Sequence, residues 1–147
     1  MVSGCNSLID TVTGASEAAE QLILSKAEMK IVYAHFVASN LIDKSITNFA
    51  HTLPVKDGMW IRVYLSQFSH ITRIVIYNRG DCCKNRIIGL NLFIKSGDEI
   101  VNDCGAITRK EDVYAFDCVG NGDMVELSKE GVVDSQNIAE IMVYGYG

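Results

Sequence analysis

The sequence has a single proline, three histidines and no apolar run close to the roughly 18 residues that a transmembrane helix needs. Basic residues are scarce as well, since 13 Lys and Arg stand against 18 Asp and Glu and give a formal net charge of −5. Nucleic acids are bound through clustered positive charge, so this balance argues against a nucleic-acid partner. The missing apolar run argues against insertion into a membrane.

Groups that would mark an enzyme are also missing. Covalent catalysis needs a nucleophile beside a base, and glycoside hydrolysis needs two facing carboxylates. The three histidines are dispersed, and no nucleophile motif accompanies them. A zinc site is not expected either, because the adjacent Cys82 and Cys83 would rarely aim at one tetrahedral ion. We therefore expect a binding protein without catalytic activity.

Five cysteines in 147 residues indicate an oxidising compartment. Cys82 and Cys83 are adjacent, Cys104 and Cys118 flank a short segment, and Cys5 is left over. Disulfides are favoured over five reduced thiols, and Cys5 is then a free thiol or an intermolecular bridge. The amino terminus has neither the basic start nor the apolar stretch of a signal peptide, so a signal was removed or was never there. We expect a secreted or extracellular protein.

Periodicity in the sequence predicts the fold class. The length is that of one domain, and apolar residues alternate with polar ones over several short runs. Turn-rich pieces separate these runs, and no convincing amphipathic helix lies among them. We expect an all-β fold, an antiparallel β-sandwich of the jelly-roll type. The predicted strands lie in residues 60–65, 71–77, 90–95, 114–118, 125–127 and 141–143.

The chain divides into a lead segment and a domain. Residues 1–19 are small and polar, and the predicted domain spans residues 20–147. In a β-sandwich the loops at one end usually carry recognition, because rigid strands hold them. Function is therefore expected in the three longest polar connections, which are residues 43–59, 79–86 and 96–112.

The segment Y-N-R-G-D-C-C-K-N-R, residues 77–86, is the most specific feature of the chain. Arg79 and Arg86 provide rigid guanidinium donors, which suit neighbouring sugar hydroxyls and a ring oxygen. Asp81 stands between them and can hold the arginines in place while offsetting their mutual repulsion. A solvated charged loop is the alternative, and the tripeptide R-G-D taken alone would suggest integrin binding.

The adjacent cysteines of this segment argue against a merely solvated loop. Consecutive Cα atoms lie about 3.8 Å apart, below the usual span of a disulfide, so a bond between Cys82 and Cys83 would close a small, rigid ring. Such a ring would offer an apolar plate to the C–H face of a sugar. Burying one methyl group on it is worth about 0.8 kcal/mol, which would favour a deoxy sugar.

Together these residues resemble the F-type lectins, or fucolectins. The family motif is a histidine followed at a distance by R-x-D-x-x-x-x-R/K, and Arg79, Asp81 and Arg86 fit its second part without a gap. His51 fits the first part, although residues 52–78 are one residue more than the family spacing. The strand W-I-R-V-Y-L and the segments I-V-I-Y-N-R, G-L-N-L-F-I, A-F-D-C and A-E-I-M-V-Y-G extend the resemblance over roughly residues 20 to 147.

The resemblance implies a site for L-fucose. The histidine and both arginines would hydrogen-bond the axial hydroxyl, its neighbour and the ring oxygen, and a vicinal disulfide would pack against the sugar. The implied partners are fucose-containing glycans or glycoproteins. The alternative is a discoidin-type module, which uses the same jelly roll for galactose-type glycans, lipids or cell-surface proteins. The implied sugar-binding residues are His51, Arg79, Asp81, Cys82, Cys83 and Arg86.

The resemblance also implies a structural calcium ion, Ca2+. Calcium prefers six to eight oxygen ligands, and residues 40–45 are similar to a loop that supplies some of them in the family. The stretch between Asp43 and His51 is shorter than in the family, so Thr47 or Asn48 would have to replace a loop ligand. A well-capped turn without a metal is the alternative. The candidate ligands are Asn40, Asp43, Ser45, Asn48, Ala139 and Glu140.

The sequence departs from the family at three further points. Phe49 and Ala139 stand where the family usually has a disulfide, so both partners of that bridge are absent. Tyr64 replaces an aspartate of the strand W-I-R-V-Y-L. The shortened loop before His51 changes a wall of the sugar pocket, and we expect it to change which sugar is accepted next to fucose.

Only one sugar motif is found in the chain, and a single sugar pocket binds weakly. Lectins usually gain affinity by presenting several pockets at once. A homo-oligomer or a longer parent protein with tandem domains would provide them. Cys5 and the lead segment, residues 1–19, are the candidate assembly elements.

Overall fold

The computed structural model describes residues 19–147, and this range is all-β apart from two short 3₁₀ helices, η2 (Ala38–Ile42) and η3 (Lys84–Ile87). All strand pairings are antiparallel, which confirms the predicted fold class. The predicted lead segment lies outside the described residues, except for Ala19. The strands are β1 (Glu20–Gln21), β2 (Leu24–Met29), β3 (Ala50–His51), β4 (Met59–Asn78), β5 (Asn91–Ser96), β6 (Glu99–Ala106), β7 (Val113–Phe116), β8 (Gly120–Lys129) and β9 (Asn137–Tyr146).

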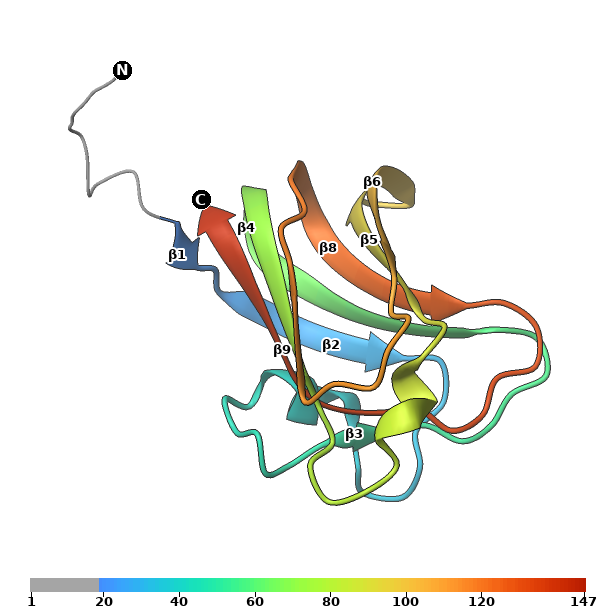
Figure 1. Cartoon of the computed structure of the whole chain (residues 1–147). Helices are drawn as coiled ribbons and strands as arrows, with labels where there is room; N and C mark the ends of the chain where they lie inside the picture. Colours follow the sequence, from blue (N-terminus) through green and yellow to red (C-terminus); the bar gives the residue numbers. More distant parts are fainter. Residues whose placement is uncertain (1–18) are drawn as a thin grey trace.

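Strand β4 belongs to both layers of the sandwich (Figure 1). Its first half pairs with β2 and β8, and β8 leads on to β5 and β6. Its second half pairs with β9 and β7, and β9 also carries β1 and β3. Hydrogen bonds run continuously through β4, so the two layers form one nine-stranded sheet that folds over a common core.

The bend in β4 corrects one prediction from the sequence. Residues 60–65 and 71–77 were expected to be two strands, but the structure joins them through residues 66–68, which are exposed. A register shift against β9 between Ile71 and Arg73 moves the in-out alternation by one residue. Apolar residues of both halves therefore face the core, where each contributes about 1.5–3 kcal/mol. The core residues of β4 are Ile61, Val63, Leu65, Ile71, Ile74 and Ile76.

A second difference concerns residues 96–112, which were expected to form a polar connection. They contain β6, an edge strand that pairs only with β5 along the main order of the sheet. Most of its side chains are exposed, so it lacks the alternation by which β4, β5, β7, β8 and β9 were predicted. Strands β1, β2 and β3 were not predicted either. A disulfide between Cys104 and Cys118 ties β6 to the segment that follows β7.

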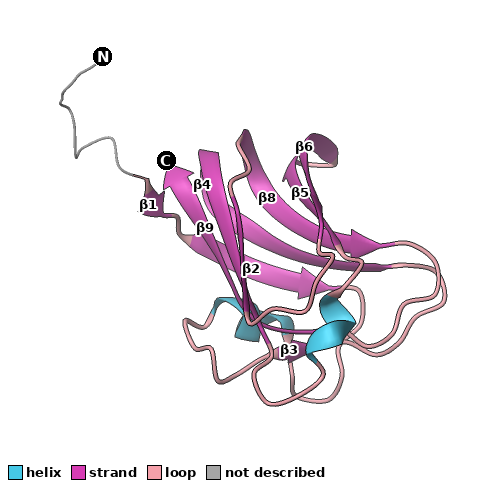
Figure 2. Ribbon diagram, viewed as in Figure 1, coloured by secondary structure: helices cyan, strands magenta, loops and turns pink. Residues whose placement is uncertain are grey.

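The connections gather at one end of the sandwich. Helices η2 and η3, strand β3 and the loops around them lie together at the end opposite the one where β9 finishes (Figures 1 and 2). This is the arrangement expected of a β-sandwich whose loops carry recognition. Within residues 19–147, neither helix has the length and apolar character required to cross a membrane.

Candidate functional site

The two-residue strand β3 positions His51 at the loop end. Its neighbour Ala50 points into the core, so His51 points the other way. The Nδ1 atom of His51 lies 2.8 Å from the carbonyl oxygen of Thr52, which can only accept, so Nδ1 carries the proton and Nε2 carries the lone pair. Burial lowers the pKa of His51 below its usual 6.5, and the nearby arginines lower it further. The histidine is therefore a neutral acceptor at neutral pH.

Arg79 is fixed from two sides. Its Nε atom donates to Oδ1 of Asp81 at 2.6 Å, and Nη2 donates to Oδ2 of the same carboxylate at 3.3 Å. The guanidinium carbon lies 4.0 Å from the centroid of the Phe49 ring, a cation–π contact. The hydrogen bond from Arg79 also lowers the pKa of Asp81, which keeps this carboxylate ionised. Arg79 is consequently preorganised with its remaining donors available.

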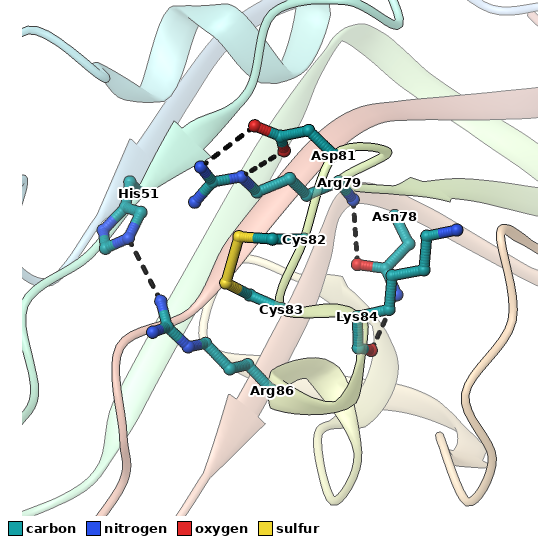
Figure 3. The surroundings of a disulfide bond; sticks show 8 residues. All are labelled: His51, Asn78, Arg79, Asp81, Cys82, Cys83, Lys84 and Arg86. Atoms are coloured by element: carbon teal, nitrogen blue, oxygen red, sulfur yellow. Dashed lines mark hydrogen bonds and ion pairs between the residues drawn. A yellow bond between two sulfur atoms is a disulfide. The ribbon is translucent and has the colours of Figure 1, made fainter.

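Arg86 comes from η3 and completes the clamp, by which we mean His51, Arg79 and Arg86. Its Nη1 atom lies 3.4 Å from Nε2 of His51. Figure 3 shows the two arginines on either side of the sulfur atoms, with His51 opposite them. The structure thus brings all the sequence-predicted sugar-binding residues into one place.

The predicted vicinal disulfide between Cys82 and Cys83 is confirmed. Cys83 has a φ of 64°, the left-handed conformation, and this turns the chain directly into η3, where its carbonyl accepts a hydrogen bond from the Arg86 backbone N–H. Cys82 is exposed and Cys83 is half-buried. The sulfur atoms therefore form an apolar surface between the arginine side chains (Figure 3).

Asn78, the last residue of β4, was missed by the sequence analysis. Its side chain donates to the carbonyl oxygens of Lys84 at 2.8 Å and Glu111 at 3.1 Å, and it accepts from the Arg79 backbone N–H at 2.9 Å. It therefore closes both ends of the loop that carries the disulfide (Figure 3). An asparagine at the end of an apolar strand was the only sign of this role in the sequence.

A cavity of about 380 Å³ lies beside Arg79 and is bounded by the short loop before β3. Asp81 and Arg79 form one wall of it, so the cavity adjoins the clamp. Its other lining combines apolar and polar side chains, from Ile46, Phe49, Ala139, Thr47 and Asn48. Phe49 and Ala139, the two positions at which the family disulfide is absent, thus both border this space.

The candidate calcium ligands are only partly assembled. Glu140 on β9 accepts a hydrogen bond from the Lys44 backbone N–H through Oε2, while its Oε1 is buried without a partner among the described residues. Burial raises the pKa of Glu140 to about 7, and the neighbouring Asp43 adds to this effect. Two adjacent carboxylates, one of them with an unpaired oxygen, fit a cation.

The remaining candidate ligands fit a calcium ion less well. Asp43 already accepts from the Ser45 backbone N–H and from the Asn48 side chain, and Asn40 donates to the carbonyl of Phe49. Ala139 could offer only its backbone carbonyl. In the described part of the chain, no group of three His, Cys, Asp or Glu side chains is placed to hold a metal. Asp43 and Glu140 are therefore the residues that would hold the ion, with carbonyl and amide oxygens completing its shell.

The other two histidines do not belong to the clamp. His70 is exposed and its Nδ1 atom lies 2.7 Å from Oδ1 of Asn121. His35 is exposed and packs beside Phe36, whose ring stacks on Phe49.

Solved structures of similar fold place the chain in a class. A fucose binding module of Streptococcus pneumoniae, SpX-3, matches with a TM-score of 0.78 and 20% identity, over 87% of this chain and 99% of that chain. An F-lectin, or fucolectin, from the serum of Morone saxatilis matches with a TM-score of 0.68 and 26% identity, over 82% of this chain and 46% of that one. Fold and site arrangement together define a discoidin-like jelly-roll binding domain.

The chain belongs to the family of NedA-like, galactose-binding domains, whose sequence pattern matches residues 40–127. It is also 41% identical to fucolectin-3 of Anguilla japonica over 73 residues, which are 46% of this chain and 41% of that protein. The chain therefore spans less than half the length of this curated relative. The resemblance to F-type lectins is confirmed, and the family is one of binding domains, as expected for a chain without catalytic groups.

Proposed function

We propose that this domain is a lectin that binds L-fucose or fucosylated glycans at the clamp. The observation that carries the proposal is the combination of a neutral histidine acceptor, an arginine fixed by Asp81 and a second arginine beside the histidine, all around an apolar disulfide. A sugar hydroxyl would replace the contact between Nη1 of Arg86 and Nε2 of His51, accepting from the first atom and donating to the second. The ring oxygen, which can only accept, would pair with the other arginine.

The disulfide supplies the part of the site that discriminates a deoxy sugar. An apolar sulfur surface gains nothing from a hydroxyl group but gains about 0.8 kcal/mol from each buried methyl group. The methyl group of fucose would pack against Cys82 and Cys83. Within the R-G-D tripeptide, Arg79 and Asp81 are bonded to each other, which counts against their presentation to an integrin.

The relatives support this assignment. Fucolectin-3 is named for fucose binding, and a structural neighbour of similar size is a fucose binding module. The F-lectin neighbour comes from serum, which supports an extracellular location for this chain. The family name favours one alternative, galactose, whose axial hydroxyl pattern is mirror-related to that of fucose.

The cavity beside Arg79 would hold the sugar that follows fucose in a glycan. Its volume of about 380 Å³ and its mixed lining suit one further sugar ring, with hydroxyls near Asn48 and Asp81 and C–H groups near Ile46. Asn48→Ala should then weaken binding of a fucosylated oligosaccharide more than binding of free fucose. Equal effects on the two ligands would remove the cavity from the site.

A calcium ion at Asp43 and Glu140 would stabilise the loop that borders the same cavity. Two observations support this ion: the raised pKa of Glu140 and its unpaired Oε1 atom. A bound cation would lower that pKa and would give Oε1 a partner. The ion would supply charge compensation to the loop and no chemistry to the sugar.

A glycan array followed by calorimetry tests the proposed function. We expect fucosylated glycans to be bound and free L-fucose to compete with them. Binding of galactose-terminated glycans that fucose does not inhibit would favour the alternative. Binding to neither class would overturn the lectin assignment.

A further inference from the structure

Strand β9 contains a bulge directly beneath the clamp. Asn78 pairs with Ile138 and Tyr77 with Glu140, so Ala139 is an extra residue without a partner on β4. Ile138 and Ile141, three residues apart, consequently both face the core. By the same shift Asn137 and Glu140 share the opposite face, which is the face covered by the loops.

Strand pairing connects Asn137 with the clamp on both sides of β9. On one side it is the direct partner of His51 in the β3–β9 ladder, and side chains of such a pair project from the same face. On the other side its neighbour Ile138 pairs with Asn78, the residue that precedes Arg79. In Figure 3 the ribbon of β9 passes behind the clamp side chains. Asn137 therefore lies beside the histidine of the clamp and one residue from the partner of Asn78, a position that we call the floor of the clamp.

The side-chain amide of Asn137 is unpaired although it is buried. The residue is 1% exposed, and neither Nδ2 nor Oδ1 has a hydrogen-bond partner within residues 19–147. Native structures rarely leave a buried amide unpaired, because each such group costs about 1–3 kcal/mol. An apolar residue would fill this position at lower cost, as Ile138 and Ala139 do beside it.

We propose that Asn137 is a further sugar-binding residue, which pairs with the ligand through a buried water beneath His51. This proposal rests on the proposed function. It gives Asn137 a part in recognising the sugar hydroxyl that Nε2 of His51 holds. One water needs two to four polar partners, and the amide of Asn137 together with a sugar hydroxyl provides them. The proposal also explains why a polar residue is retained where it weakens the fold.

The test compares Asn137→Leu, a replacement of similar size, with the parent protein. Removing an unpaired buried amide should leave the melting temperature unchanged or raise it. Fucose affinity should fall by about five-fold or more, the value of a hydrogen bond or two. Affinity equal to that of the parent would overturn the proposal. A parent that does not bind fucose at all would instead overturn the proposed function.

Two further variants separate a binding role from a structural one. Gln136→Leu is the matched control, because Gln136 also has an unpaired buried oxygen but lies opposite Thr52 on the other face, and its affinity should equal that of the parent. Asn137→Ser keeps a small polar group, so it should retain more affinity than Asn137→Leu. If Asn137→Leu melts much lower and Asn137→Ser matches the parent in both affinity and melting temperature, Asn137 is structural and the proposal is wrong.

Discussion

The Nη1 atom of Arg86 lies 3.4 Å from Nε2 of His51, although 35 positions separate the two residues in the sequence. Each comes from a very short element, β3 or η3, that is held at the end of the sandwich by β9 or β4. The contact places a permanent cation beside the histidine, which helps to keep the ring neutral. Acceptor and donor are thus presented to a ligand at the same point.

Replacing Arg86 with alanine should weaken fucose binding strongly. Hydrogen bonds to a charged group are worth about 1.5–3 kcal/mol, so the dissociation constant should rise about ten- to hundred-fold. Arg73→Ala is the control, because it removes an arginine that is paired with Asp117 and lies outside the clamp. Calorimetry measures both. Equal affinity of the Arg86 variant and the parent would exclude Arg86 from the site.

Acid should weaken binding through His51. The pKa of this histidine lies below 6.5, so affinity should be constant from pH 8 to about 6.5 and should fall below that, as a proton occupies the Nε2 acceptor. Glu140, with a pKa of about 7, titrates in the same window, so the series is repeated with Glu140→Gln. His51→Gln should bind more weakly but without this pH dependence. Affinity that increases on acidification would mean that Nε2 donates to the sugar.

The two disulfides should have separate roles. The Cys104–Cys118 bond closes a loop with a sequence separation of 14, and a loop of this size stabilises the fold by about 3 kcal/mol. The Cys82–Cys83 bond links neighbours and restricts the unfolded chain very little. Replacing Cys104 and Cys118 by alanine should therefore lower the melting temperature and leave sugar affinity unchanged.

Replacing Cys82 and Cys83 by alanine should have the opposite pattern. Fucose affinity should fall by about four-fold or more, since at least one methyl group loses its apolar contact. The melting temperature should stay close to that of the parent. Loss of stability without loss of affinity would show that this disulfide shapes the loop and does not contact the sugar.

Calcium should raise the melting temperature if Asp43 and Glu140 bind it, because a ligand of the folded state stabilises that state by mass action. Glu140→Gln keeps the shape of the side chain but removes its buried charge. Without calcium this variant should melt higher than the parent, and it should not respond to calcium. A parent that melts at the same temperature with calcium and with chelator lacks the site.

Assembly can be tested through the one cysteine that the two disulfides leave over. Four of the five cysteines are bonded in pairs, so Cys5 remains for an intermolecular bond. Light scattering should show a larger species for the full chain without reductant, and a monomer with reductant or for a chain starting at Glu20. Identical masses in all four conditions would exclude the lead segment from assembly.

The sequence predicted much of the fold because alternation is strong wherever a strand has one buried face. Residues 60–65 and 71–77 both lie within β4, and only the joining of the two through exposed residues 66–68 was unpredicted. The edge strand β6 has few buried side chains and therefore no pattern to detect. Bulges such as the one at Ala139 depend on how a strand pairs with its neighbour, so the sequence of one strand alone does not locate them.

The site was predictable where its residues are close in sequence. Residues 79–86 form one loop, and their spacing already brings two arginines and the adjacent cysteines together. Asn78 and Asn137 were missed because their roles depend on groups brought near them by folding. These are two loop carbonyl groups for Asn78 and His51 on the neighbouring strand for Asn137. Single asparagines in apolar strands carry no information about such partners.

Strand β9 has a consequence for the order of events during synthesis. Of the nine strands described it is the last to be synthesised, yet it pairs with β1, β3 and β4, which come earlier. His51 has no ladder partner until Asn137 emerges, and the second half of β4 lacks its main neighbour until then. A nascent chain stopped before β9 would already contain every residue of the clamp but could not arrange them. If the domain binds a sugar as proposed, binding should appear only after β9 has paired, which would make it a sensitive reporter of complete folding.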